Sequence, residues 1–138
     1  LVAKFNTQVM DNDSSSLNPA STDYLVEENN QYWYGLIEGI YLVVIPEKYT
    51  GDRTADIVDK MLIYVQTSTK YENDVQKYVK YLIKANNEEI TNSEIETLLK
   101  EAKDNASAGK TSNNGKGISV GFLQADNYYE YQVIRLFK

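Results

Sequence analysis

The chain is 138 residues long, lacks histidine and cysteine altogether, and carries a net charge of -6. Without imidazole and thiol groups, the chain alone forms no histidine-based catalytic triad, few zinc sites and no thiol chemistry. An acidic chain repels nucleic-acid phosphates, so we expect no nucleic-acid partner.

The length fits a single domain spanning residues 1–138, and the 42% hydrophobic content is typical of a folded globule. Because the chain holds no run of about 18 apolar residues, we expect no transmembrane segment. The first residue is Leu1 and not methionine, which leaves room for a signal peptide or a membrane tether upstream.

The first expected element is a short amphipathic helix, because apolar side chains recur there at helical spacing: Leu1, Val2, Phe5 and Val9. The polar residues 11–16 then predict a loop, and residues 24–26 fit a strand or the start of one. The strongest strand signal comes next, since residues 32–37 and 40–45 are rich in aromatic and branched side chains. Glu38-Gly39 between them predicts a two-residue hairpin turn, in which glycine takes a positive φ.

Residues 56–69 fit two structures. Dense β-branched side chains in residues 62–69 favour a strand. One face of a helix is also matched, by Ile57, Val58, Met61, Leu62 and Val65. We favour a third antiparallel strand that returns along residues 40–45, with the helix as the alternative.

Two further helices are predicted from their N-terminal caps. Thr69-x-x-Glu72 and Thr91-x-x-Glu94 both fit a capping box, in which the hydroxyl and the carboxylate bind free backbone amides. Ile90 and Ile95 add a hydrophobic staple to the second box. We expect the helix that follows it to end near Asn105.

Residues 105–117 predict a flexible loop from their glycine, serine and asparagine content. Two strands follow, residues 118–123 and 128–137, with a turn at Asp126-Asn127. Alternation in the last strand places four residues on one face: Tyr129, Tyr131, Val133 and Arg135. The whole pattern predicts an α+β fold with an antiparallel sheet of about five strands packed on helices, in the order α-βββ-αα-ββ.

Four short stretches resemble small extracytoplasmic lipoprotein-type domains of Gram-positive bacteria. They are Phe5-Asn6 on the first helix, Gly39-Ile40-Tyr41-Leu42-Val43 at the start of a strand, Ile95-x-x-Leu98-Leu99 on a capped helix, and Gly117-Ile118-Ser119-Val120. The acylated cysteine of such proteins is absent from these residues. The resemblance implies an exported domain of the cell envelope or the exterior, with a curved sheet draped around a helix, and it implies no catalytic residue.

Two stretches match ligand-binding motifs only in part. Ala108-Gly109-Lys110-Thr111 echoes the end of a phosphate-binding loop, but the earlier glycine is replaced by Asp104 and the stretch follows a helix. Asp11-x-Asp13-x-Ser15 begins like a calcium loop, but Ser16 and Thr22 replace its glycine and glutamate. No spacing selects a pair of catalytic carboxylates. We therefore expect no metal, no cofactor and no enzymatic activity.

Tyrosine is the unusual component of this chain, with 12 residues beside 3 phenylalanines and 1 tryptophan. Tyrosine combines an apolar ring with a polar tip, which suits binding interfaces. The candidate binding residues are rings of the predicted strands and one arginine suited to an anionic group: Tyr32, Trp33, Tyr34, Tyr41, Tyr129, Tyr131 and Arg135, with Tyr128 beside them. In the alternative interpretation, alternate rings fill the core, the others shield the sheet, and Arg135 points outward, stacked on Tyr131 or paired with an acid.

The sequence thus predicts a non-catalytic, extracytoplasmic binding or structural domain, secreted or on the cell surface. It would recognise a protein or other partner through an aromatic sheet face. The alternative is an acidic intracellular inhibitor or decoy that occupies a basic groove on its target. Partly exposed rings fit the first hypothesis, whereas clustered acids with buried rings fit the second.

Overall fold

The computed structural model describes residues 2–13, 17–21, 24–28, 31–46, 57–106, 112–113 and 117–136. Three helices and a 3-10 turn lie within these ranges: α1 (Val2–Asp13), η1 (Glu72–Asp74), α2 (Val75–Asn86) and α3 (Asn92–Asn105). The strands are β1 (Val26–Glu28), β2 (Gln31–Ile37), β3 (Ile40–Pro46), β4 (Ile57–Gln66), β5 (Ser112–Asn113), β6 (Ile118–Gln124) and β7 (Tyr128–Leu136). The predicted order of elements is confirmed. β1 begins at the end of the stretch 24–26 that fitted the start of a strand, whereas β5 was not predicted.

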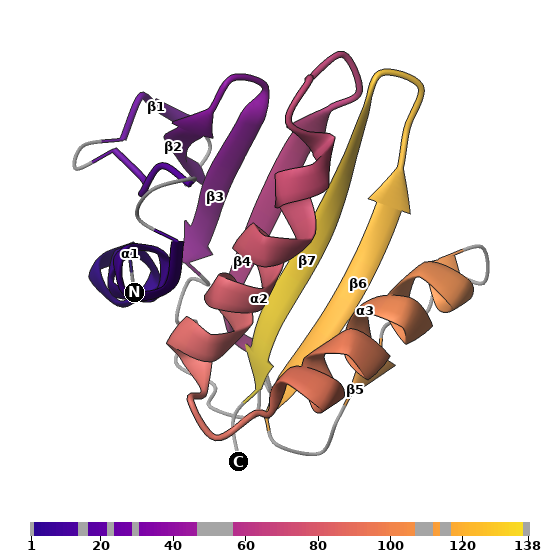
Figure 1. The fold of residues 1–138 in the computed structure, drawn as a ribbon. Helices are drawn as coiled ribbons and strands as arrows, with labels where there is room; N and C mark the ends of the chain where they lie inside the picture. Colours follow the sequence, from indigo (N-terminus) through magenta and orange to yellow (C-terminus); the bar gives the residue numbers. More distant parts are fainter. Residues whose placement is uncertain are drawn as a thin grey trace, which may run out of the picture.

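The described strands form one sheet of seven in the order β1-β2-β3-β4-β7-β6-β5. Every neighbouring pair is antiparallel. Figure 1 shows α2 and α3 lying across one face of this sheet, with α1 beside α2 on the same side. The α+β class expected from the sequence is confirmed, and the described helices leave the other face of the sheet uncovered.

The hairpin of β2 and β3 turns at Glu38-Gly39, as predicted. Gly39 has a φ of 83°, a left-handed conformation that costs other residues about 1–2 kcal/mol. A Cβ at this position would also lie 2.8 Å from the Cβ of Thr69. The Thr69 hydroxyl donates a hydrogen bond of 2.6 Å to the carbonyl of Glu38, so the turn is held against the chain that leaves β4.

Residues 57–66 form a strand, β4, so the favoured alternative for this region is confirmed. β4 pairs with β3 on one side and with β7 on the other. A central strand is buried on both faces, and four apolar residues of β4 are at most 8% exposed: Met61, Leu62, Ile63 and Val65. Such a continuous apolar run also matches a helical face, which explains why the sequence left both structures open.

The two predicted capping boxes have different outcomes. At Thr91 the box is present, because Glu94 N donates to the Thr91 hydroxyl at 3.2 Å and Thr91 N donates to the Glu94 carboxylate at 3.1 Å. At Thr69 the prediction is wrong, because η1 intervenes and the N-cap of α2 is Asp74. The Thr69 hydroxyl instead accepts from Tyr71 N at 3.2 Å and holds the β2–β3 turn.

Two predicted loops are shorter than expected. α1 extends to Asp13, into the polar residues 11–16, and the Asn12 amide donates to the Gln8 carbonyl of this helix at 2.9 Å. The stretch 105–117 contains β5, a strand of two residues that pairs with β6 and is too short to show alternation. α3 ends at Asn105, as expected. Residues 14–16, 107–111 and 114–116 lie outside the described residues.

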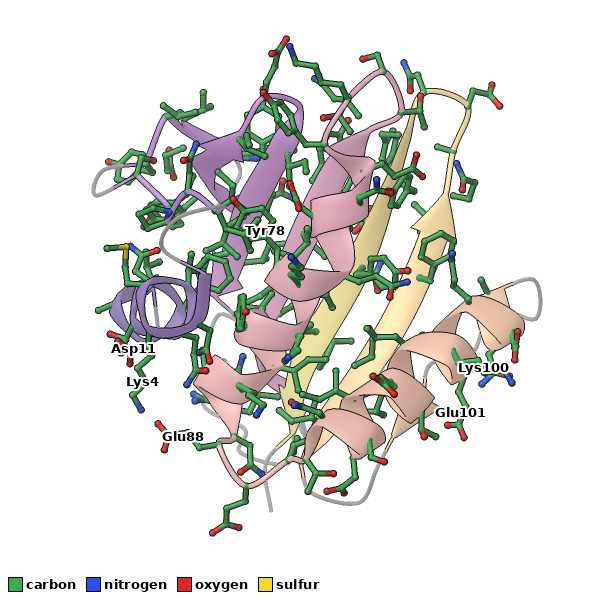
Figure 2. All side chains as sticks on the ribbon, viewed as in Figure 1. Lys4, Asp11, Tyr78, Glu88, Lys100 and Glu101 are labelled. Carbon is green, nitrogen blue, oxygen red and sulfur yellow. The ribbon has the colours of Figure 1, made fainter. Side chains whose placement is uncertain are left out.

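The helices bury one apolar cluster against the sheet. Tyr78 of α2 lies inside it at 0% exposure, and Figure 2 shows the labelled charged side chains at the periphery. The Tyr78 hydroxyl donates to the Asn18 carbonyl at 2.9 Å and accepts from Asn18 N at 3.1 Å. The Asn6 side chain of α1 binds both backbone groups of Ala20, at 3.1 and 2.7 Å. The segment after α1 is thus fastened to α1 and to α2.

Candidate functional site

The candidate site is the open face, which we define as the face of the sheet opposite the helices. Alternate residues of each strand belong to it. Leu42 and Ile63 face the helices and belong to the buried apolar cluster. Their neighbours Val43 and Leu62 are buried as well but do not belong to that cluster, because they lie on the open face.

Two parallel ranks of side chains cross the open face. In the first, directly paired residues follow one another over five strands: Gly35, Tyr41, Tyr64, Glu130 and Leu123. In the second, the pairing continues over six strands: Val26, Trp33, Val43, Leu62, Gln132 and Gly121. Since neighbouring strands lie about 4.8 Å apart, the second rank is roughly 24 Å long. The two ranks form a single band.

Four rings pack together on the open face, three of them from the two ranks and the fourth from a position two residues before Glu130 on β7. We call them the aromatic row: Trp33, Tyr41, Tyr64 and Tyr128. The ring centres of Trp33 lie 5.9 Å from Tyr41 and 5.0 Å from Tyr64, in edge-to-face geometry. Tyr64 and Tyr128 are stacked, with centres 4.8 Å apart and an interplanar angle of 21°. These contacts hold the rings in place, so the row is a preorganised surface.

Trp33 and Tyr64 meet across an intervening strand. Trp33 lies on β2 and Tyr64 on β4, and β3 runs between them, with Val43 paired to Trp33 and Tyr41 paired to Tyr64. Because the two rings close over β3, Val43 is 0% exposed. The rings of the aromatic row are half-buried, so each keeps part of its surface toward solvent.

Exposed aliphatic side chains extend the band beyond the rings. Val26, opposite Trp33, is 51% exposed, and Leu123, opposite Glu130, is 42% exposed. Leu25 is 61% exposed, and its methyl carbon lies 3.2 Å from the position of a Cβ on Gly35. Contiguous exposed apolar surface on a folded domain marks an interaction site.

Glu130 is the carboxylate of the two ranks. Burial raises its pKa, while a hydrogen bond from Gln132 and the charge of Lys60 act in the opposite direction. The Gln132 amide donates to Glu130 Oε2 at 3.4 Å. Burial also raises the pKa of Tyr64, and Tyr128 and Glu130 add to this effect, so the phenol stays neutral. The band therefore offers rings, methyl groups and one partly desolvated carboxylate.

The structure divides the sequence-predicted residues between the two faces. Those on the open face are Trp33, Tyr41 and Tyr128. Tyr32 and Tyr34 point to the helix side, because neighbours on a strand alternate. There they contact Tyr24, with ring centres 5.2 and 6.5 Å away. The run Tyr32-Trp33-Tyr34 is thus split, and Trp33 alone joins the aromatic row.

Tyr129 and Tyr131 also lie on the helix side, at 9% and 2% exposure, and line a cavity between α2 and α3. The core-filling interpretation therefore describes these two rings. Arg135 is exposed near the other end of β7 from Tyr128. The structure does not bring Arg135 to the aromatic row.

Sequence reasoning missed Tyr64, Val26 and Leu123. Tyr64 lies directly opposite Tyr41. The sequence predicted that residues 40–45 pair with the next strand, and the register of that pairing would have placed Tyr64 beside Tyr41. Val26 and Leu123 join the band only through the pairing of β1 with β2 and of β6 with β7. No local pattern marks those two side chains as part of one surface.

The ligand-loop motifs fall largely outside the described residues. Asp11 belongs to α1, whereas Ser15, Ser16, Thr22 and residues 108–111 are not described. Among the described side chains, no three acidic, histidine or cysteine groups are placed to hold a metal ion. None of the described helices is both long and apolar enough to cross a bilayer.

Comparison with known proteins gives no match. No family model fits the sequence, no curated protein is significantly similar to it, and no solved structure is significantly similar to the fold. The resemblance to extracytoplasmic lipoprotein-type domains therefore stays a prediction. The function has to be argued from the site itself.

Proposed function

We propose that this protein is a non-catalytic binding domain that docks a partner protein on the open face of its sheet. The observation that carries the proposal is the continuity of the band, in which exposed and half-exposed apolar side chains follow one another from Val26 through the aromatic row to Leu123. Tryptophan and tyrosine dominate the energetics of protein interfaces, above all in preorganised clusters.

The partner docks on the face of the sheet and not on its edges. The two edge strands of the described sheet have three residues in β1 and two in β5. Short edge strands offer few backbone groups for the addition of a further strand. Side chains of the open face are therefore the main contact surface.

Charge defines the surface that the partner presents. Glu130 is already partly withdrawn from water, which raises its pKa, and an interface would withdraw it further. A buried carboxylate needs a cationic partner. The partner therefore places an arginine or lysine opposite Glu130, within an apolar surface. The net charge of -6 on the chain favours the approach of such a basic surface.

We further propose that the domain works outside the cytoplasm and has no enzymatic role. The first part is supported by the resemblance to extracytoplasmic lipoprotein-type domains and by the lack of cysteine, which suits an exported bacterial protein that folds without disulfides. The second is supported by the lack of imidazole and thiol groups, the usual proton shuttle and nucleophile of enzymes.

The experiment compares two positions of equal exposure. Val26 on the open face and Met10 on α1 are both 51% exposed. A photo-reactive benzoylphenylalanine at each position is activated in extracts of the native cell. We expect a protein cross-linked from Val26 that is not cross-linked from Met10, because only the first position lies on the proposed docking surface.

The captured protein is then purified and its affinity measured by calorimetry. We expect Trp33→Ala and Tyr64→Ala each to weaken binding about thirtyfold, as interface hot spots do. Met10→Ser is the control and leaves the affinity unchanged. Equal affinity for Trp33→Ala and the wild type contradicts the proposal. Capture of a second copy of the chain also contradicts the proposal. A loss of binding when acidic residues of α3 such as Glu96 are replaced contradicts it too, and supports the decoy alternative.

A further inference from the structure

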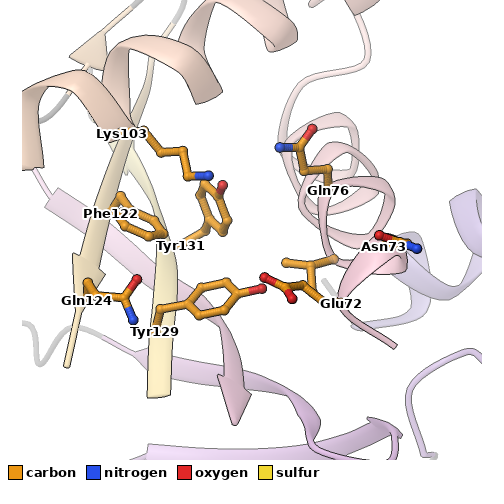
Figure 3. Close-up of a pocket in the computed structure, with 9 residues that line it drawn as sticks. Glu72, Asn73, Gln76, Lys103, Phe122, Gln124, Tyr129 and Tyr131 are labelled. Carbon is orange, nitrogen blue, oxygen red and sulfur yellow. The ribbon is translucent and has the colours of Figure 1, made fainter. Parts of the chain in front are cut away.

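A second site lies on the helix side of the sheet. A cavity of about 460 Å³ opens between the start of α2, the end of α3, and the region where β6 ends and β7 begins (Figure 3). Small-molecule sites measure about 300–1,000 Å³, so its size suits a small ligand. The cavity is separated from the open face by the sheet and is independent of the docking surface proposed above.

Three rings form the floor of the cavity. The ring centre of Phe122 lies 5.0 Å from Tyr131 and 5.8 Å from Tyr129, and the two tyrosine rings meet nearly at right angles, at 81°. Tyr131 is 2% exposed and Tyr129 9%, so packing fixes both rings. The floor is therefore rigid and apolar, and it carries two phenol oxygens.

The two phenols have defined hydrogen-bond roles. Burial raises the pKa of Tyr129 to about 12, and the charge and hydrogen bond of the Glu72 carboxylate also raise it. The Tyr129 hydroxyl thus donates to Glu72 and keeps its lone pairs as acceptors. Burial raises the pKa of Tyr131 as well, whereas a hydrogen bond with Gln76 lowers it, as expected when the amide donates to the phenol oxygen. The Tyr131 hydroxyl can therefore donate a hydrogen bond to a ligand.

Polar side chains form the rim, and their charges balance. Glu72 and Gln76 come from η1 and α2, and Lys103 comes from α3 on the other wall. The Lys103 Nζ lies 5.6 Å from the ring centre of Phe122. One carboxylate and one ammonium leave no net charge, and the amides and phenols supply both donors and acceptors. The carboxylate of the rim repels an anion such as phosphate, and the ammonium repels a cationic amine. The rim therefore disfavours ligands with a net charge of either sign.

We propose that this cavity binds a neutral mono- or disaccharide, with one sugar ring packed against the half-buried ring of Phe122 and its hydroxyls near the Tyr129 phenol and the polar rim. A pyranose carries C–H groups on its faces, which pack against aromatic carbon. It carries hydroxyls around its edge, and each of these both donates and accepts. The cavity matches both properties, with rings beneath and amide, phenol, carboxylate and ammonium groups around them. Any neutral sugar with these two properties fits the proposal.

The test is a titration of the whole chain followed by heteronuclear NMR of backbone and aromatic groups. The neutral probes are glucose, galactose, mannose and N-acetylglucosamine, and the charged probes are inorganic phosphate and methylammonium. For at least one neutral probe we expect saturable shifts at Phe122, Tyr129 and Tyr131, with a dissociation constant of about 1 mM or tighter. The charged probes produce no saturable shift at these rings.

Two matched pairs of variants locate the binding. Tyr129→Phe removes one hydroxyl from the floor, and its control Tyr128→Phe makes the same change on the open face. Lys103→Ala removes the ammonium from the rim, and its control Lys100→Ala acts one turn earlier on α3, outside the lining. We expect each cavity variant to weaken binding about tenfold and each control to leave it within about twofold.

Several outcomes overturn the proposal. They are the absence of saturable shifts with all four sugars, binding of phosphate or methylammonium at these rings in their place, and equal affinities within either matched pair. The NMR spectrum of each variant shows directly whether it is folded, so a loss of binding is read only from folded protein.

Discussion

Tyr128 and Tyr129 are neighbours on β7, but they lie in different environments. Tyr128 stacks on Tyr64 on the open face and is half-buried. Tyr129 lies beneath the helices at 9% exposure, packs against Phe122, and has its pKa raised to about 12. The same side chain is part of a half-exposed aromatic row in one case and of a cavity lining in the other, because the described helices cover one side of the sheet.

The two faces also differ in what holds their side chains in place. On the covered face, helices bring Tyr78 and Phe5 against Ile63 and its neighbours in one buried cluster. On the open face, the rings of Trp33 and Tyr64 hold one another across a strand. Substitutions on the covered face are therefore expected to act on stability, and those on the open face on binding.

The largest effect is expected for Ile63→Ala on the covered face. Ile63 is 0% exposed in the central strand, and truncation of such a residue costs about 2–5 kcal/mol of unfolding free energy. Val26→Ala on the open face is the contrast, with a change of less than about 0.5 kcal/mol. Urea denaturation measures both. A loss below about 1 kcal/mol for Ile63→Ala would contradict the claim that the covered face determines stability.

Next in size is the effect of Tyr78→Phe. The change removes a hydroxyl that binds both backbone groups of Asn18, and the loss of such partners costs about 1–3 kcal/mol. The same change at Tyr128, on the open face, alters the unfolding free energy by less than about 0.5 kcal/mol. Equal losses for the two variants, measured in the same denaturation experiment, would argue against a division between the faces.

A smaller loss is expected for Thr91→Ala, which weakens the helix that covers β6. The variant removes the hydroxyl that accepts from Glu94 N and costs about 1 kcal/mol. Thr97→Ala on the exposed side of α3 is the control, since its hydroxyl donates within the same helix, to the Ser93 carbonyl. Hydrogen exchange of α3 amides reports the difference. Faster exchange in the Thr97 variant than in the Thr91 variant would contradict this account of the cap.

The smallest effect concerns pH and Glu130 on the open face. Burial raises its pKa above the ordinary 4.5, so the stability it contributes is complete below about pH 4.5 and is lost as the pH rises through the raised value. Glutamine does not ionise. We therefore expect Glu130→Gln to gain stability relative to the wild type as the pH rises above about 4.5. Thermal unfolding at several pH values measures this, and a difference that does not change with pH would contradict it.

Local patterns were sufficient for most elements of the fold. The Thr91 cap, the Glu38-Gly39 turn and the alternation in β7 each depend on neighbours in sequence, and each is present. Thr69 has the same motif as Thr91, but its hydroxyl binds the carbonyl of Glu38. That contact comes from a distant part of the chain, and the motif alone does not reveal it.

The candidate site was harder to predict for the same reason. Alternation alone separates Trp33 from Tyr32 and Tyr34, and this signal was available in the sequence. The joining of Trp33 to Tyr64 and of Tyr64 to Tyr128 depends on the order and register of β2, β3, β4 and β7. The choice of face depends on where the helices pack. No single stretch of sequence predicts the strand register or the face on which the helices pack.

The most direct measurement is the quenching of Trp33 fluorescence by acrylamide, because Trp33 is the single tryptophan of the chain and lies in the aromatic row. We expect acrylamide to quench Trp33 in the free protein, and we expect Trp33 to be protected when the protein captured at Val26 is bound. A Trp33 that is already shielded in the free protein, or that is quenched equally in the complex, would contradict the claim that the open face is the docking surface.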